Sequence, residues 1–160
     1  MTADATEGRQ TPRYLDVADK VWPVLWRAAG LHTRAYQATG GRIGHSIPGL
    51  SGKMCLLDHV GAKSGKKRTS PLLYVKNGED VVLVASKGGF PKHPAWYHNL
   101  LAHPDTTVQI GSERRPVHAR VARPEERERL WEMAVKAYGG YKAYKRRTDR
   151  EIPLVVLEPR

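Results

Sequence analysis

The sequence predicts a mainly β fold of the α+β class, an antiparallel barrel or closed sheet with an N-terminal helix and further helices between the strands. Two turn signals predict strands joined as hairpins: Asn77-Gly78 and the turn around Gly111-Ser112. The element order α, β-β-β, α, β-β, α, β lacks the strict alternation of a doubly wound parallel sheet. The length of 160 residues suffices for one core without a disulfide or a metal. We expect a disordered lead over residues 1–12 and a single domain over 13–160.

The first part of the chain is expected to be helical. From Tyr14 to Ala29 the apolar residues recur on one helical face. Pro23 is expected to bend this helix or to split it into two pieces. Helical character continues from Leu31 until Gly40-Gly41, and the remainder to Leu50 is typical of a loop.

Three strands are expected next, because the pattern changes to β-like apolar runs. The first run is Met54 to Val60, and the second is Pro71 to Lys76. Asn77-Gly78 is the sequence signal of a type I′ turn, which leads into a third strand from Asp80 to Ala85. This hairpin is the clearest strand pair in the chain.

A short helix and a second hairpin follow. Pro94 suits the first turn of a helix from Ala95 to Ala102, which His103-Pro104 ends. Residues Thr106 to Ile110 and Pro116 to Val121 alternate between apolar and polar side chains, as strands with one buried face do.

The last third of the sequence predicts a long helix, a short helix and a final strand. Pro124 opens the long helix, and Gly139-Gly140 ends it. A short helical piece carries Tyr141 and Tyr144. The chain closes with a strand from Ile152 to Leu157, where Pro153 indicates an edge strand or the start of a strand.

Composition limits the function classes. The formal net charge of +11 admits nucleic acid, an anionic membrane surface or a polyanionic small molecule as partner, and also a solvated basic surface without one. The single cysteine, Cys55, lies in an apolar run, which fits a buried thiol and a reducing compartment. Since no signal peptide or membrane span is evident, we expect a cytoplasmic protein.

Two basic, glycine-containing segments indicate an anion site. Gly61 to Arg68 combines cations with backbone N–H groups, and Ala85 to Gly89 follows the third strand. Antiparallel pairing of the strands between them brings both segments to one rim of the sheet. The alternative is a solvated loop on a basic surface.

Other motifs fit poorly. In Gly61 to Lys66 the glycine spacing is too short for a nucleotide-binding P-loop, and a strand follows instead of a helix. His93, His98 and His103 recur every five residues and do not stack on a helix, so we expect no metal. His59 beside Asp58 is either a base or a hydrogen-bonded structural histidine.

Three blocks of sequence resemble the deazaflavin-dependent nitroreductase family of actinobacteria. They are Gly-Ala-Lys-Ser-Gly-Lys-Lys-Arg-Thr-Ser-Pro-Leu (61–72), Val-Ala-Ser-Lys-Gly-Gly (84–89) and Pro-Ala-Trp-Tyr-His-Asn-Leu-Leu-Ala-His-Pro (94–104). The resemblance implies a split β-barrel related to FMN-binding oxidases, and an oxidoreductase that uses coenzyme F420.

The resemblance also implies which residues bind the cofactor. Lys63, Ser64 and Arg68 should hold the phosphate of F420, and Lys66 and Lys67 should reach the carboxylates of its polyglutamate tail. The full set of implied cofactor-binding residues is Ala62, Lys63, Ser64, Gly65, Lys66, Lys67, Arg68, Pro71, Leu72, Ala85, Ser86, Lys87, Gly88, Gly89, Trp96 and Asn99.

The chemistry implied is hydride transfer from the reduced deazaflavin to an electron-poor acceptor such as a quinone, a nitroaromatic or an unsaturated lactone. Ser86 and the tyrosines at 138, 141 and 144 are the candidate catalytic proton donors. The three tyrosines recur every three residues on one helical side, where they either pack in the core or face a ligand.

Several alternatives stay open. An FMN-dependent enzyme shares the architecture, and a nucleic-acid-binding module would use the aromatic and basic residues of 141–147. The helix with Trp22 and Trp26 suits either packing on the barrel or peripheral contact with a membrane. The sequence does not decide between a monomer and a homodimer.

Overall fold

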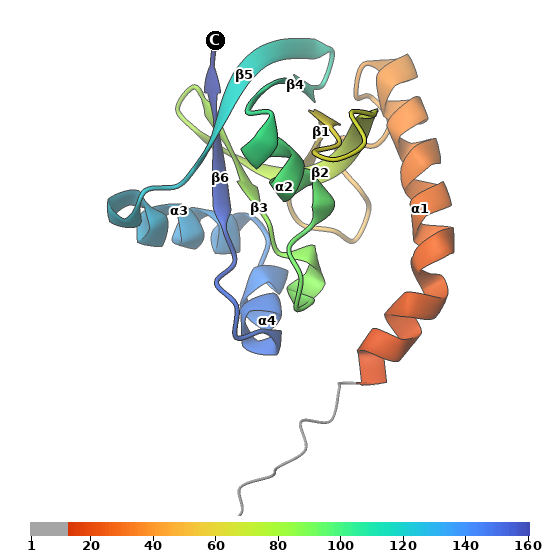
Figure 1. The fold of residues 1–160 in the computed structure, drawn as a ribbon. Helices are drawn as coiled ribbons and strands as arrows, with labels where there is room; N and C mark the ends of the chain where they lie inside the picture. Colours follow the sequence, from red (N-terminus) through yellow and green to blue (C-terminus); the bar gives the residue numbers. More distant parts are fainter. Residues whose placement is uncertain (1–12) are drawn as a thin grey trace, which may run out of the picture.

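The computed structural model describes residues 13–160 and shows the antiparallel barrel that the sequence predicts (Figure 1). The expected lead over 1–12 lies outside the described residues. The strands close in the order β1-β2-β3-β6-β5-β4. Their bounds are β1 Lys53–Val60, β2 Lys67–Asn77, β3 Asp80–Val84, β4 Asp105–Ile110, β5 Glu113–Val121 and β6 Leu154–Pro159.

The strand bounds confirm the two hairpins and correct several details. β5 begins at Glu113 and not at Pro116, and β6 starts and ends two residues later than expected. The predicted type I′ turn is wrong, because Asn77 pairs with Asp80 and the turn is Gly78-Glu79.

β2 begins at Lys67 and not at Pro71, because Lys67 and Arg68 pair with Val60 and His59 of β1. Of the two positions that Pro153 indicated, the start of a strand is confirmed and the edge is not, since β6 pairs with both β3 and β5. Pro153 lies just before β6, where its missing N–H costs no ladder bond, and its carbonyl accepts the N–H of Ala85 over 2.9 Å.

The barrel interior is filled by alternate residues of its strands, as the two-residue period of a strand requires. Cys55 and Leu57 of β1 meet Val155 and Leu157 of β6 in this cluster, and all four are at most 2% exposed. The intervening residues of β3 and β6 are buried too, because α3 (Pro124–Ala137) and α4 (Gly140–Arg147) cover that outer face. The continuous apolar runs of β3 and β6 follow from burial on both faces.

α1 (Arg13–Thr39) is one helix, and Pro23 does not split it. It runs beside the β1 and β2 side of the barrel in Figure 1. Val24 and Leu31 on it are each 68% exposed. The side chains of Trp22 and Trp26 lie outside the described part. Within the described residues, no helix is apolar and long enough to cross a membrane.

Two short helical segments sit at the end of the barrel where β1 and β3 finish. η1 (Lys87–Gly89) is a single 3-10 turn after β3, and α2 (Ala95–Ala102) begins after Pro94 as expected. Figure 1 shows α4 beside the turn that follows β3. The long helix α3 begins at Pro124, and the Glu126 carboxylate caps it by accepting the N–H of Arg123 over 3.1 Å.

Candidate functional site

A large open cavity lies at this end of the barrel, with a volume of about 1170 Å³. Its size exceeds that of most sites for drug-sized ligands, which suits a long cofactor together with a second molecule. Its walls come from α1, β1, β2, β3, η1, α2 and the tyrosines around α4. The predicted site residues among its lining are Ala62, Lys63, Ser64, Arg68, Pro71, Leu72, Ser86, Lys87, Gly88, Trp96, Asn99, Tyr138, Tyr141 and Tyr144.

The remaining predicted residues lie behind or beside the wall. Lys66 and Lys67 are exposed outside it, as is Gly65, whose φ of 65° fits the turn. Ala85 is fully buried in the barrel core, and Gly89 is buried under α4. The structure thus brings together both ends of the basic loop and most of the segment after β3.

The loop Gly61 to Lys66 uses several of its backbone donors inside the protein. The N–H of Gly61 donates to the Lys66 carbonyl over 2.9 Å, and the N–H of Gly65 donates to the Gly61 carbonyl over 2.8 Å. Asn99 Oδ1 accepts the N–H of Ala62 over 2.9 Å. The sequence suggested a cradle of backbone donors, whereas the charged side chains of Lys63 and Arg68 supply the positive potential at the cavity wall.

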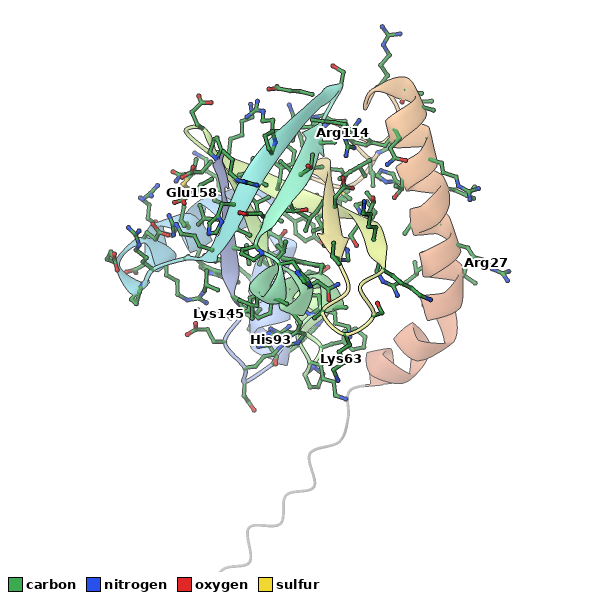
Figure 2. All side chains as sticks on the ribbon, turned by 45° about the horizontal axis from the view of Figure 1, so that its top comes forward. Arg27, Lys63, His93, Arg114, Lys145 and Glu158 are labelled. Carbon is green, nitrogen blue, oxygen red and sulfur yellow. The ribbon has the colours of Figure 1, made fainter. Side chains whose placement is uncertain are left out.

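Lys63 lies at the end of the barrel opposite Arg114 and Glu158 (Figure 2). The same view shows Arg27 of α1 pointing away from the barrel. Arg114 is paired with Asp58, and Arg120 with Glu126 and Glu158. The basic residues of the cavity therefore form a separate group from the paired charges on the far end.

Arg150 shapes the segment after β3, and sequence reasoning missed it. Its guanidinium donates to the carbonyls of Ala85, Ser86 and Phe90 over 3.2, 2.7 and 2.8 Å, and to Nδ1 of His93 over 2.9 Å. These bonds hold a turn in which Lys87 has a φ of 45°. An isolated arginine in a polar stretch gives no sequence signal for this role.

A polar row crosses the cavity wall beside the basic loop. Asn99 Nδ2 lies 2.8 Å from His59 Nδ1, and His59 Nε2 lies 2.9 Å from Ser70 Oγ. His59 is 5% exposed, and burial is the main cause that lowers its pKa. Of the two readings the sequence left open, the hydrogen-bonded histidine is the one that the structure shows. Ser70 gave no signal, because its partner is eleven residues away across a strand pair.

Three tyrosines form a second wall. The hydroxyls of Tyr138 and Tyr144 lie 3.0 Å apart, and the ring of Tyr141 packs edge-on against both rings. Burial, the main cause, raises the pKa of Tyr144 to about 12, and it also raises the pKa of Tyr141. The expected core packing is confirmed for Tyr141, and all three tyrosines line the cavity.

The aromatic and basic residues of 141–147 do not form an open stacking surface. Tyr141 is 5% exposed, Lys145 lies over the ring of Trp131, and Arg147 lies over the ring of Tyr144. The aromatic rings that would stack on bases are therefore directed toward the protein interior and the cavity.

Apolar residues complete the cavity. Pro71, Leu72 and Trp96 were expected there, whereas Leu25 and Ala29 of α1 and Met54 of β1 were not. The α1 residues were missed because the sequence does not show on which side of the barrel the helix lies. The result is a cavity with one basic side and several apolar and aromatic sides.

Sequence comparison shows the family to which this chain belongs. The chain matches the family described as F420H(2)-dependent quinone reductase over residues 28–159. An F420H(2)-dependent quinone reductase of Mycobacterium tuberculosis is 43% identical over 133 residues, which are 81% of this chain and 89% of the relative.

Solved structures agree. That of an F420-H2 dependent reductase, FDR-A, superposes with a TM-score of 0.61 and is 47% identical, covering 66% of this chain and 93% of its own. Another, of a domain-swapped dimer, has a TM-score of 0.64 and is 40% identical, covering 85% of this chain and 99% of its own. Both confirm the split-barrel fold, and the first confirms the resemblance to F420-dependent reductases. The chain therefore belongs to the F420H(2)-dependent quinone reductase family.

Proposed function

We propose that this protein uses the cavity to reduce a quinone with F420H2. The observation that carries the proposal is the joining of a basic wall, with Lys63 and Arg68, to an apolar and aromatic wall in one cavity. A quinone is the acceptor in the name of the family and of the relative in Mycobacterium tuberculosis. The family assignment does not favour the FMN-dependent alternative.

The residues present fit coenzyme F420. Its phosphodiester and carboxylates match the side chains of Lys63 and Arg68 and the hydroxyl of Ser64. Its planar ring system matches the apolar side chains of Pro71, Leu72 and Trp96. Lys66 and Lys67 remain candidates for the flexible tail, since both are exposed beside the basic wall.

When bound, the reduced deazaflavin supplies a hydride. The protein holds the reactants close together and removes water from around them. Leu50 and Met54 line the cavity with apolar surface, and Arg150 fixes the shape of the turn that presents Ser86. The acceptor also needs a proton at its oxygen, and the tyrosine wall holds hydroxyl protons there. Because its pKa is about 12, Tyr144 stays protonated at neutral pH.

The test is turnover of purified protein with F420H2 and menadione. We expect oxidation of F420H2 that depends on both protein and quinone, and binding of F420 that quenches or shifts the fluorescence of that cofactor. FMN is titrated in parallel. Stoichiometric FMN binding with no response to F420 would contradict the proposal.

We also propose that α1 brings the cytoplasmic protein to a membrane surface that holds a lipid-soluble quinone. Val24 and Leu31 are exposed on α1. Leu25 of the same helix is 52% exposed, and it also lines the cavity. Sedimentation with anionic lipid vesicles tests this, with Val24→Ser/Leu31→Ser as the weakened variant. If these substitutions instead dissociate a dimer measured by light scattering, α1 serves self-association.

A further inference from the structure

A row of hydrogen bonds connects the basic loop to the apolar wall of the cavity. It runs from the Ala62 amide to Asn99 Oδ1 (2.9 Å), from Asn99 Nδ2 to His59 Nδ1 (2.8 Å) and from His59 Nε2 to Ser70 Oγ (2.9 Å). The four residues come from the loop, α2, β1 and β2. The row therefore joins four separate segments of the cavity wall.

The direction of every bond in this row follows from its first member. A backbone amide can only donate, so the Asn99 atom that faces Ala62 is the carbonyl oxygen and the one that faces His59 is the NH2 group. His59 Nδ1 must then accept, which places the ring proton on Nε2, where it donates to Ser70. This arrangement requires a neutral imidazole.

We propose that neutral His59 is a positioning residue for the cofactor, since it orients Asn99 to hold the Ala62 amide and thereby fixes the loop that carries Lys63. The inference rests on the proposed function for its ligand, but the row itself belongs to the protein alone. The Asn99 side chain, 7% exposed, uses both its oxygen and its nitrogen in the row. Asn99 therefore binds the Ala62 amide of the loop and also lines the cavity.

Protonation of His59 breaks the row at a defined place. An added proton on Nδ1 would face the NH2 group of Asn99, so two donors would oppose each other. Asn99 can relieve this by rotating its amide through a half turn, but its NH2 group then faces the N–H of Ala62. Without the rotation Asn99 loses the partner that orients its amide, and with the rotation the loop loses its bond to α2.

Burial is the largest influence on the pKa of His59, and the charged groups around it have opposing effects on that pKa. Arg68 lies opposite His59 in the register of β1 and β2 and lowers the pKa of His59, whereas the neighbouring Asp58 raises it. Asp58 is itself paired with Arg114 of β5, and α2 contributes the neutral Asn99. Burial, the largest cause, also lowers the pKa. His59 is therefore neutral near pH 7, and the row is intact there.

Two substitutions separate the functions of the imidazole. His59→Asn places an amide oxygen near the position of Nδ1, so it can still accept from Asn99 but does not titrate. His59→Gln places its amide near the position of Nε2, so it keeps the contact with Ser70 and lacks the acceptor for Asn99. Both are neutral and polar, and each serves as the control of the other.

The experiment measures the dissociation constant of F420 by fluorescence titration from about pH 8 to about pH 5, a range around the usual histidine pKa of about 6.5. The cofactor's own ionisations cancel in the ratio of the wild-type constant to the His59→Asn constant. We expect this ratio to rise about tenfold toward the acid end, as loss of one hydrogen bond implies. We expect His59→Gln to bind F420 about tenfold more weakly than His59→Asn at every pH, for the same reason.

Two measurements on the ligand-free wild-type protein do not depend on any variant folding. Histidine ¹⁵N shifts should show a protonated Nε2 and an unprotonated Nδ1 for His59. Hydrogen exchange of the Ala62 amide, corrected for intrinsic rates, should quicken as His59 becomes protonated. A protonated Nδ1 at neutral pH, or a binding ratio that stays constant across the range, overturns the inference. If the wild type binds no F420 at any pH, the proposed function fails, and these two measurements still decide the row.

Discussion

The hydroxyl oxygen of Tyr36 accepts the backbone N–H of Gly111 over 2.8 Å, although 75 residues separate them. The same hydroxyl donates to the Met54 carbonyl over 3.1 Å, and it lies 3.0 Å from His45 Nδ1. Tyr36 is fully buried near the end of α1. This one side chain therefore attaches α1 to β1 and to the turn between β4 and β5.

Tyr36→Phe should destabilise the protein without changing its shape. The Gly111 N–H would lose its acceptor, which costs about 1–3 kcal/mol when the group stays buried. Urea unfolding measures the change in the free energy of unfolding. Tyr97→Phe, at a partly exposed tyrosine, is the control with an expected change below about 0.5 kcal/mol. Equal stability of the two variants would argue against this role for the Tyr36 hydroxyl.

Lys63→Ala and Arg68→Ala should each weaken F420 binding by about 1–3 kcal/mol, the range for a lost hydrogen bond to a charged group. Fluorescence titration gives the dissociation constants. Lys76→Ala and Lys136→Ala are the controls, since both lysines are exposed and do not line the cavity; for them we expect less than about 1 kcal/mol. Unchanged binding in both wall variants would remove the phosphate assignment.

Gly89→Ala should perturb the tyrosine wall. A Cβ at Gly89 would lie 2.7 Å from the Tyr144 carbonyl, and the φ of 81° disfavours a side chain. At Gly88 the φ is 63°, but only the Phe90 ring is near, at 3.7 Å. Gly88→Ala should therefore cost only about 1–2 kcal/mol of backbone strain. We expect Gly89→Ala to cost more and to raise the KM for menadione, and equal effects of the two substitutions would contradict this.

Tyr144→Phe tests the proton donor. If Tyr144 protonates the acceptor, its loss should lower kcat for quinone reduction by about 100-fold, the lower end for general acid catalysis. Because its pKa is about 12, the hydroxyl is protonated below that value, so wild-type kcat should not fall on this account until the pH approaches 12. Stopped-flow kinetics measures both effects. Tyr138→Phe and Ser86→Ala are run beside it, and a full kcat in all three would place the donor elsewhere.

Cys55 should resist thiol reagents until the protein unfolds. It is fully buried, and burial raises the pKa of its thiol to about 12 from 9.0. Since the folded pKa is the higher one, the stability is complete below pH 9.0 and falls as the pH rises from there toward 12. The rate of labelling should equal the unfolding rate measured by stopped flow. Fast labelling under native conditions would contradict the burial.

The sequence predicted those parts of the fold that depend on local signals. Asn77-Gly78 marked the place of the first hairpin, but the turn itself is Gly78-Glu79, because Asn77 ends β2 and pairs with Asp80. Gly78 has a φ of 64° and Glu79 has no positive φ, so the predicted type I′ turn was wrong. The burial of β3 and β6 on both faces explains their unbroken apolar runs. The start of β2 was missed because Lys67 and Arg68 belong to the strand through backbone pairing and not through apolar side chains.

The site was only partly predictable for a related reason. Residues within the basic loop were found from their own charges, but Arg150 and Ser70 act through partners that only the folded chain brings near. Arg150 reaches carbonyls 60 to 65 residues away. Pro153 left an edge strand and the start of a strand as alternatives, and the start is confirmed, since β6 begins one residue later. A proline signals a missing donor but does not reveal that the strand has neighbours on both sides.

The closed barrel also bears on aggregation. Each of the six strands in residues 13–160 has a neighbour on both sides, so this ring offers no unpaired strand to a strand from another molecule. Two copies of this protein cannot extend a common sheet through these strands without opening one of the barrels. Association between intact barrels must therefore use helices or loops, and mutations that loosen the short β1–β4 pairing are the ones expected to promote fibre-like growth.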